Sequence, residues 1–239
     1  MDDIVKRLIG QEGTTVRLMV RSDGGRSRQV VATRHKVELT GVRSHMLDNG
    51  VGLIDIDYFT PHTPRSVADA VDDLAGQGMK SLVLDLRGNT GGVYSGIVAT
   101  ADLFVPAQRI MFMEKPLDGK SSPVRSQKPT ATEVPIVVLV DNKTGGAELV
   151  AAALLRTNRG TVVGPQTAGS SQNKHQIKRP DGSSDLIGQS EFLLYHNKRI
   201  TGEGVRPNVI LPDSATPDEV VHKGIELARQ AAERGVSRR

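Results

Sequence analysis

The chain has 239 residues, of which 37% are hydrophobic and 24% are charged, a composition typical of a globular protein with one or two domains. Aromatic residues make up 3% and Trp is absent, which argues against the stacking surfaces that bind single-stranded nucleic acids. The net charge of +4 comes from basic residues scattered among 27 acidic ones. Because nucleic-acid binding needs a continuous basic footprint, we expect no nucleic-acid partner.

Residue types that are missing or dispersed narrow the chemistry further. The absence of Cys excludes disulfides, thiol catalysis and zinc sites built on thiolates. The six His residues show no metal-ligand spacing, so we expect no metal site and no cofactor. No run approaches the roughly 18 apolar residues of a transmembrane span. The amino-terminal stretch MDDIVKRLIG is too polar for a signal peptide.

The first 38 residues are predicted to form a short helix over residues 2–9 and a β-hairpin over residues 14–34. In the hairpin Val16, Leu18 and Val20 alternate with polar residues, and residues 23–25 supply the turn. One helix and two strands are too small to bury a core alone. We therefore interpret residues 1–38 as the last part of a small domain, followed by a larger domain over residues 39–239.

The larger domain alternates predicted strands with predicted helices. Strands are expected over residues 50–59, 80–87, 134–141 and 160–164, and helices over residues 63–76, 93–104 and 148–155. Residues 165–190 are predicted to be a polar loop, followed by a strand over 192–197 and a helix that starts with a capping box at residues 216–219. This alternation predicts an α/β fold with a mainly parallel sheet.

Ligand sites in such folds lie where the carboxyl ends of strands lead into helices. Two junctions stand out: LDLRGNTGGVYSG at residues 84–96 and DNKTGGAELVAAALL at residues 141–155. The backbone amides of Gly91 and Gly92 precede a helix, an arrangement that can form an oxyanion hole. A tight turn that needs glycine explains these residues equally well. Asp85 and Arg87 are interpreted as a structural ion pair.

Several motifs, in the same order along the chain, resemble those of the carboxyl-terminal processing peptidases, also called tail-specific proteases. They are LDLRGNTGG followed by ADLF, then VPIVVLVDNKTGGAELVAAALL, and GEGVRPNVILPD. The resemblance implies a crotonase-like core with a mainly parallel sheet, preceded by a partial PDZ domain in residues 1–38. It also implies a periplasmic or cell-envelope location, peptide or protein C-terminal segments as partners, and a possible homo-oligomer.

The family performs serine-type hydrolysis with a Ser–Lys dyad, in which a desolvated lysine activates the serine. Matching the motifs places the nucleophile at Gly145 and the lysine at Ser170, so both dyad residues are absent from these positions. Sliding the match by one residue offers Thr144 or Gly146, and still no serine. Gly91, Gly92 and Gly146 match the oxyanion-hole and peptide-binding positions.

Three hypotheses follow. In the first, the protein is a peptide-binding or scaffolding pseudoprotease that has lost hydrolysis. In the second, it is an endopeptidase in which Thr144 acts with Lys143 or Lys174, or in which Ser170 or Ser171 is recruited, although Thr144 is equally plausible as a helix N-cap. In the third, it is a crotonase-like acyl-binding enzyme. A hydroxyl within about 3.2 Å of a lysine amine near Gly91 would favour the second.

Overall fold

A computed structural model describes residues 7–21, 25, 27–34, 41–179, 181–194 and 198–236, which fall into two compact units, Met1–Leu39 and Thr40–Arg239. In the first unit β1 (Thr15–Arg21) pairs antiparallel with β2 (Ser27–Thr33), which confirms the predicted hairpin. The side chain of Arg34 donates to the carbonyls of Leu8 and Thr15 at 2.8 and 3.1 Å. Most of the predicted helix over residues 2–9 and part of the predicted turn lie outside the described residues.

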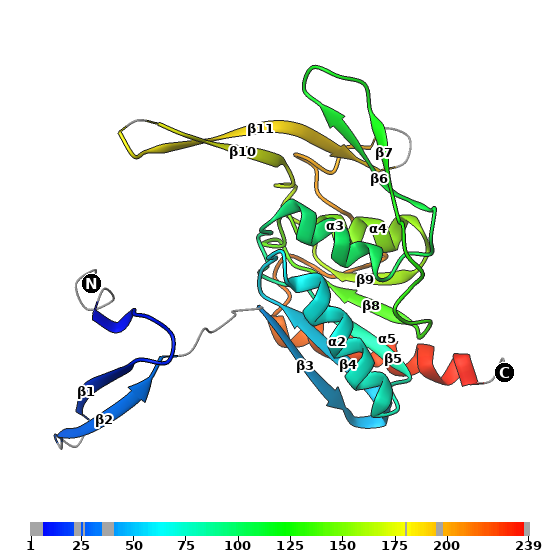
Figure 1. Cartoon of the computed structure of the whole chain (residues 1–239). Helices are drawn as coiled ribbons and strands as arrows, with labels where there is room; N and C mark the ends of the chain where they lie inside the picture. Colours follow the sequence, from blue (N-terminus) through cyan, green and yellow to red (C-terminus); the bar gives the residue numbers. More distant parts are fainter. Residues whose placement is uncertain are drawn as a thin grey trace. The chain divides into compact units, whose positions relative to one another are not determined.

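The second unit is built on a six-stranded sheet with the order β12-β9-β8-β5-β4-β3. All neighbouring strands are parallel except β3 and β4, so the predicted mainly parallel sheet is confirmed (Figure 1). Sequence analysis found the four central strands and missed the two edge strands. The bounds are β3 (Val42–Leu47), β4 (Val51–Ile56), β5 (Ser81–Asp85), β8 (Ile136–Leu139), β9 (Gly160–Gly164) and β12 (Val209–Ile210).

Helices cover both faces of this sheet. The core on one face joins α2 (Thr63–Gly76), α3 (Tyr94–Asp102) and α4 (Glu148–Arg156), whereas α5 (Pro217–Val236) packs on the other face. Within β5, Leu82 and Leu84 face the first core and Val83 faces the second. A strand covered on both faces needs apolar residues at every position, which explains the uninterrupted apolar run of the sequence.

A smaller antiparallel sheet lies on the outer side of α3 and α4 (Figure 1). Its order is β10-β11-β6-β7, with β10 (Asn173–Lys178), β11 (Ser184–Leu193), β6 (Ile110–Pro116) and β7 (Ser122–Arg125). The predicted polar loop over residues 165–190 is therefore wrong, because it contains β10 and most of β11. The hairpin formed by β10 and β11 extends beyond the helices (Figure 1), and its apolar residues Ile177, Leu186 and Ile187 are exposed. It therefore lacks the alternation of a half-buried strand.

Aromatic and polar contacts fasten the smaller sheet to α3. The ring of Phe192 stacks on Tyr94 with centroids 5.4 Å apart and meets the edge of Phe112 at 5.5 Å. The Glu114 carboxylate accepts hydrogen bonds from the Tyr94 hydroxyl at 2.9 Å and the Ser190 hydroxyl at 2.5 Å. Burial, together with the nearby Glu114 carboxylate, raises the pKa of Tyr94, so its hydroxyl remains a donor at neutral pH.

The last helix begins with the predicted capping box. The Thr216 amide donates to Glu219 Oε2 at 2.7 Å, and the Glu219 amide donates to Thr216 Oγ1 at 3.3 Å. These reciprocal bonds satisfy amides that have no partner inside the helix. The predicted ion pair is also present, since Arg87 contacts Asp85 at 2.6 Å and donates to the carbonyl of Pro217 at 2.6 Å. The pair thereby ties the start of α5 to the end of β5.

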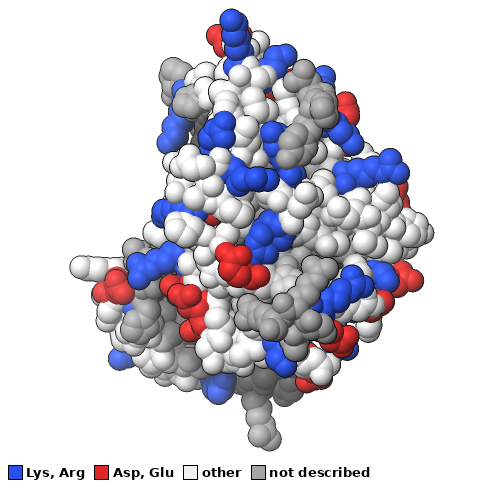
Figure 2. All heavy atoms as spheres, turned by 90° about the vertical axis from the view of Figure 1, so that its right-hand side faces the viewer, with Lys and Arg blue, Asp and Glu red and all other residues white. Residues whose placement is uncertain are grey.

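The surface carries charges of both signs. Figure 2 shows Lys and Arg side chains spread over one face, with Asp and Glu side chains between them. In the part of the chain that the structure describes, no helix combines the length and the apolar character needed to cross a bilayer.

Two helical glycines have opposite surroundings, and we predict opposite effects of alanine. A Cβ on Gly224 in α5 would lie 2.2 Å from Leu139 Cδ2, whereas a Cβ on Gly76 in α2 would meet nothing within 4 Å. Gly224→Ala should lower the free energy of unfolding by about 1–3 kcal/mol through overpacking. Gly76→Ala should raise it by about 0.5–1 kcal/mol through helix propensity. Urea unfolding measures both, and a stabilised Gly224→Ala would contradict the packing of α5 on β8.

Candidate active-site cleft

The two predicted glycine turns meet at the carboxyl edge of the six-stranded sheet. One turn follows β5 and the other follows the neighbouring strand β8. The Gly145 amide donates to the Asn89 carbonyl at 2.9 Å, and the Gly146 amide donates to the Thr90 carbonyl at 2.8 Å. A Cβ on Gly91 would lie 3.0 Å from the Cα of Gly146. The turns therefore pack backbone against backbone, and only residues without a side chain permit this distance.

Asn89 fixes the first turn, a role that sequence analysis did not assign to it. Its side chain is buried, donates from Nδ2 to the Ile56 carbonyl at 2.7 Å and accepts at Oδ1 from the Gly91 amide at 2.8 Å. Gly91 and Gly92 have φ values of 123° and 141°, in the region that favours glycine. A Cβ on Gly92 would also lie 2.2 Å from the Phe59 carbonyl oxygen. The turn interpretation of these glycines is thus confirmed.

The three glycine amides differ in their availability to a ligand. The amides of Gly91 and Gly146 are already bonded to Asn89 Oδ1 and the Thr90 carbonyl. The Phe59 amide donates to the Gly91 carbonyl at 2.9 Å, and the Val93 amide donates to the Phe59 carbonyl at 2.9 Å. Within the described residues, the amide of Gly92, which lies between Gly91 and Val93, donates to no acceptor. Of these three glycine amides, that of Gly92 is therefore the one available to an incoming oxygen.

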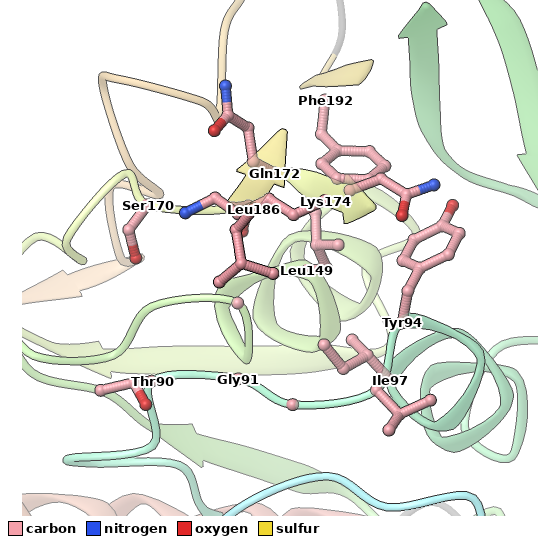
Figure 3. A pocket seen from close by; sticks show the side chains of 15 residues that line it. Thr90, Gly91, Tyr94, Ile97, Leu149, Ser170, Gln172, Lys174, Leu186 and Phe192 are labelled. Atoms are coloured by element: carbon pink, nitrogen blue, oxygen red, sulfur yellow. The ribbon is translucent and has the colours of Figure 1, made fainter. Parts of the chain in front are cut away.

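A pocket of about 450 Å³ opens in front of these turns (Figure 3). Its volume falls within the range of about 300–1,000 Å³ that is common for small-ligand sites. The smaller sheet supplies the opposite wall, so the pocket lies between the two sheets of the second unit. Its lining comprises Thr90, Gly91, Gly92, Val93, Tyr94, Ile97, Gly146, Leu149, Ser170, Ser171, Gln172, Asn173, Lys174, Leu186 and Phe192.

The buried Glu148 carboxylate holds the loop that supplies Ser170 and Ser171. It accepts hydrogen bonds from the Gly169 amide at 2.9 Å, the Ser171 amide at 2.8 Å and the Thr167 hydroxyl. Burial raises the pKa of Glu148 above its ordinary value, although these hydrogen bonds favour the charged form. Sequence analysis assigned no role to Glu148, the residue that shapes the loop.

The comparisons with known proteins agree with this architecture. The family model described as peptidase family S41 matches residues 50–211. The chain belongs to peptidase family S41. It is 29% identical over 218 residues to the carboxy-terminal processing protease CtpA of Bacillus subtilis (strain 168), which covers 90% of this chain and 47% of that protein. Against a carboxyl-terminal-processing protease of Synechocystis sp. it is 27% identical, covering 97% of this chain and 56% of that one.

A solved structure named photosystem II D1 C-terminal processing protease has the same fold, with a TM-score of 0.65 and 24% identity. The match covers 93% of this chain and 62% of that structure. The chain spans about half the length of the curated relatives it matches. The recognition made from the motifs is confirmed at the level of the family.

In this S41 domain the structure brings the two expected dyad positions together. A Cβ built on Gly145 would lie 2.5 Å from Ser170 Oγ and 2.7 Å from the Thr90 carbonyl oxygen. Residues 145 and 170, which the family resemblance assigns to the dyad, thus lie next to each other. One position has no side chain, however, and the other carries a hydroxyl in place of the family's amine.

Thr144 lies behind the pocket and not in it. Its side chain is buried, and Oγ1 accepts from the Asp141 amide at 2.9 Å. The same oxygen lies 3.0 Å from the Leu86 carbonyl and 3.0 Å from Asp141 Oδ1, which compete for its single proton. Thr144 does not cap α4 either, because the N-cap residue is Ala147. This hydroxyl stabilises the turn after β8, which does not favour Thr144 as the nucleophile.

The lysines considered as bases differ in position. Lys143 is exposed and is not part of the pocket lining, whereas Lys174 projects into the pocket from β10. Figure 3 shows the Lys174 side chain reaching toward the side of the pocket that carries Ser170. Among the described residues of the pocket lining, no Ser or Thr hydroxyl forms a hydrogen bond with a lysine amine. The geometry that would favour a rewired dyad is therefore missing from these residues.

We predict that returning a serine to position 145 destabilises the fold. In Gly145→Ser the new Cβ meets the fixed Thr90 carbonyl and Ser170 Oγ, so the two turns must separate, at a cost of about 1–3 kcal/mol. Thermal unfolding measures the loss. Gly76→Ser is the matched control, since the same change there has open space around it. Equal melting temperatures for the two variants would contradict the close packing of the turns.

The pKa of Glu148 predicts a pH dependence of stability. A carboxyl group whose pKa is raised on folding binds more protons in the folded chain than in the unfolded one between the two pKa values. The free energy of unfolding should therefore fall as the pH rises from the ordinary Glu value of 4.5 through the raised pKa. Urea unfolding at several pH values should show this fall in the unaltered protein and a smaller one in Glu148→Gln.

Glu219 provides a control because its pKa is shifted in the opposite direction from that of Glu148. The Thr216 amide lowers the pKa of Glu219, so its contribution to stability is present above the ordinary Glu value and is lost as the pH falls through the lowered pKa. Glu219→Gln should leave the fall assigned to Glu148 in place. If it removed that fall and Glu148→Gln did not, the assignment to Glu148 would be wrong.

Proposed function

We propose that this S41 domain binds peptide or protein C-terminal segments in the pocket and does not hydrolyse them, and is thus a peptide-binding pseudoprotease. The observation that carries the proposal is the absence of space for a side chain at position 145, where a Cβ would lie 2.5 Å from Ser170 Oγ. Hydrolysis through an acyl-enzyme needs a nucleophile and a base in contact. Binding a peptide in the pocket, in contrast, requires neither a nucleophile nor a base.

The surroundings of Gly92 support the binding part of the proposal. The turn at Gly91–Val93 bridges to Phe59 on one side, and on the other side Gly92 faces the pocket with a free amide among the described residues. An extended peptide gains affinity from main-chain bonds to such a stretch and specificity from side-chain pockets. The apolar side chains of Ile97, Leu149 and Leu186 offer the pocket for a side chain.

The first unit and the cellular location belong to the proposal as well. We interpret residues 1–38 as the C-terminal part of a PDZ-like domain, with β1 and β2 as two of its strands. We also place the protein in the periplasm or cell envelope. The support is the family's usual organisation together with the hairpin. The activity, substrates and partners of the whole protein are proposals of the same kind.

We predict that peptides with an apolar carboxyl-terminal residue bind to the pocket and remain intact. Leu186 lines the pocket and is 67% exposed, so a ligand that covers it gains apolar burial. Leu186→Ser should weaken binding about tenfold, as expected for the loss of a buried leucine side chain. Titration calorimetry measures the binding, and mass spectrometry of the peptide after a day of incubation measures cleavage.

The control variant is Leu117→Ser. Leu117 is 63% exposed and does not line the pocket, so its replacement should leave binding unchanged. Casein and a fluorophosphonate probe test hydrolysis independently of the peptide. Cleavage that disappears in Ser170→Ala would overturn the pseudoprotease in favour of a recruited serine. Absence of binding by every peptide would overturn the binding function.

A further inference from the structure

Strand β10 forms an open edge of the smaller sheet. In the order β10-β11-β6-β7 it has a neighbour on one side, and the hairpin that carries it extends beyond the helices (Figure 1). Among the described residues, no backbone group of β10 forms a hydrogen bond outside its pairing with β11. Because an antiparallel strand uses every second residue for one neighbour, the remaining amides and carbonyls of β10 point away from the sheet. Such an edge accepts an added strand.

The two faces of this edge differ in chemistry. Lys174 and Lys178 are four residues apart on one face of β10, and Ile177 lies on the other. The register pairs Ile177 with Asp185, so Ile187 of β11 is the diagonal neighbour of Ile177 on the same face. Both isoleucines are exposed, by 45% and 49%, and both lysines are exposed as well. The edge is therefore basic on one face and aliphatic on the other.

The two lysines have no counter-charge within the part of the chain that the structure describes. Neither forms an ion pair, and the nearby Asp185 is paired with Arg179 at 2.6 Å. Unlike charges directly opposite each other stabilise a pair of strands, whereas like charges destabilise it. Lysines on an edge strand thus discourage pairing with neutral or basic strands. A strand with acidic residues on the matching face is favoured.

A second copy of this chain does not offer such a strand. In the described ranges the other edge strands are β1, β2, β3, β7 and β12. None of them contains Asp or Glu, and all except the two-residue β12 contain Arg. Pairing of β10 with any of the four Arg-containing strands would bring basic side chains together. The charges therefore point to a different molecule as the partner.

We propose that β10 is a docking edge for an extended segment of another protein in which acidic and aliphatic residues alternate. The segment pairs with β10 through its main chain. Its acidic side chains lie beside Lys174 and Lys178, and its aliphatic side chains extend the surface of Ile177 and Ile187. Main-chain bonds supply affinity and the two faces supply specificity. Ile177 and Lys178 are not part of the pocket lining, so this interaction is separate from peptide binding in the pocket.

The test uses a fluorescent peptide of alternating Glu and Val, acetylated and amidated so that it has no free carboxyl terminus, titrated with the whole protein by fluorescence anisotropy. It should bind at least about threefold more tightly than a peptide of alternating Lys and Val, as expected for exposed charge pairs. Lys178→Glu should bring the two affinities together, and Lys174→Glu with Lys178→Glu should reverse their order. If the acidic peptide does not bind, or binds no better than the basic one, the docking edge is wrong.

Methylation of the peptide main chain separates strand addition from general attraction between charges. The acidic peptide is made in two versions, each with N-methyl groups on the amides of one edge. One version should lose about tenfold or more in affinity and the other should not, because one edge of an added strand faces β10. Equal affinities of the two versions would contradict pairing through the main chain.

Lys120→Glu is the matched control, because Lys120 is exposed in the turn between β6 and β7 and not on the β10 edge. It should leave the ratio of the acidic and basic peptides unchanged. An equal change in Lys120→Glu and Lys178→Glu would overturn the docking edge and reduce the effect to general surface charge. The peptide with a free apolar carboxyl-terminal residue should bind Lys178→Glu as it binds the unaltered protein. Failure of the pocket and failure of the edge are thus measured separately.

Discussion

The contact between the two glycine turns is the constraint on which the site depends. Two backbone hydrogen bonds of 2.9 and 2.8 Å join residues 145–146 to residues 89–90, and Gly91 lies directly against Gly146. Such contacts are possible only because the residues that touch, Gly91, Gly145 and Gly146, have no side chains. The close packing positions the Gly92 amide, fixes one end of the pocket, and at the same time occupies the space that a nucleophile at position 145 would need. In the proposed function, the binding geometry and the absence of an attacking side chain at position 145 therefore have one structural cause.

The loop opposite these turns depends on a different interaction. Glu148 is buried, and among the described residues no cation hydrogen-bonds to it. Three donors of residues 167–171 satisfy its oxygens. The loop is held from its other side as well, because the Val205 amide donates to Thr167 Oγ1 at 2.7 Å and the Thr201 hydroxyl donates to the Ser171 carbonyl at 2.6 Å. The motif that includes Gly204 thus acts on the pocket through the loop. A carboxylate held this way gives a defined loop, although its own burial is unfavourable.

The sequence predicted those parts of the structure that depend on local pattern or on burial of whole strands. The apolar runs of β5 and β8, the helices after them and the capping box at Thr216 were all found because each follows a short-range rule. The proximity of residues 145 and 170 agrees with the dyad positions that the family resemblance implied. Strands β10 and β11 were missed because exposed apolar residues such as Leu186 remove the alternation that marks a half-buried strand.

Lys174 was a candidate base from the sequence, but the missed strands explain why its place in the pocket wall was not predicted. Lys174 is four residues from Ser170 in the chain, but its place in the pocket depends on the pairing of β10 with β11, with an irregularity between Asn173 and Lys174. That pairing depends in turn on β11 binding β6 and on Phe192 packing against Tyr94. Such contacts join residues far apart along the chain and leave no local pattern. The charged side chain of this pocket is therefore carried by the sheet that sequence periodicity could not detect.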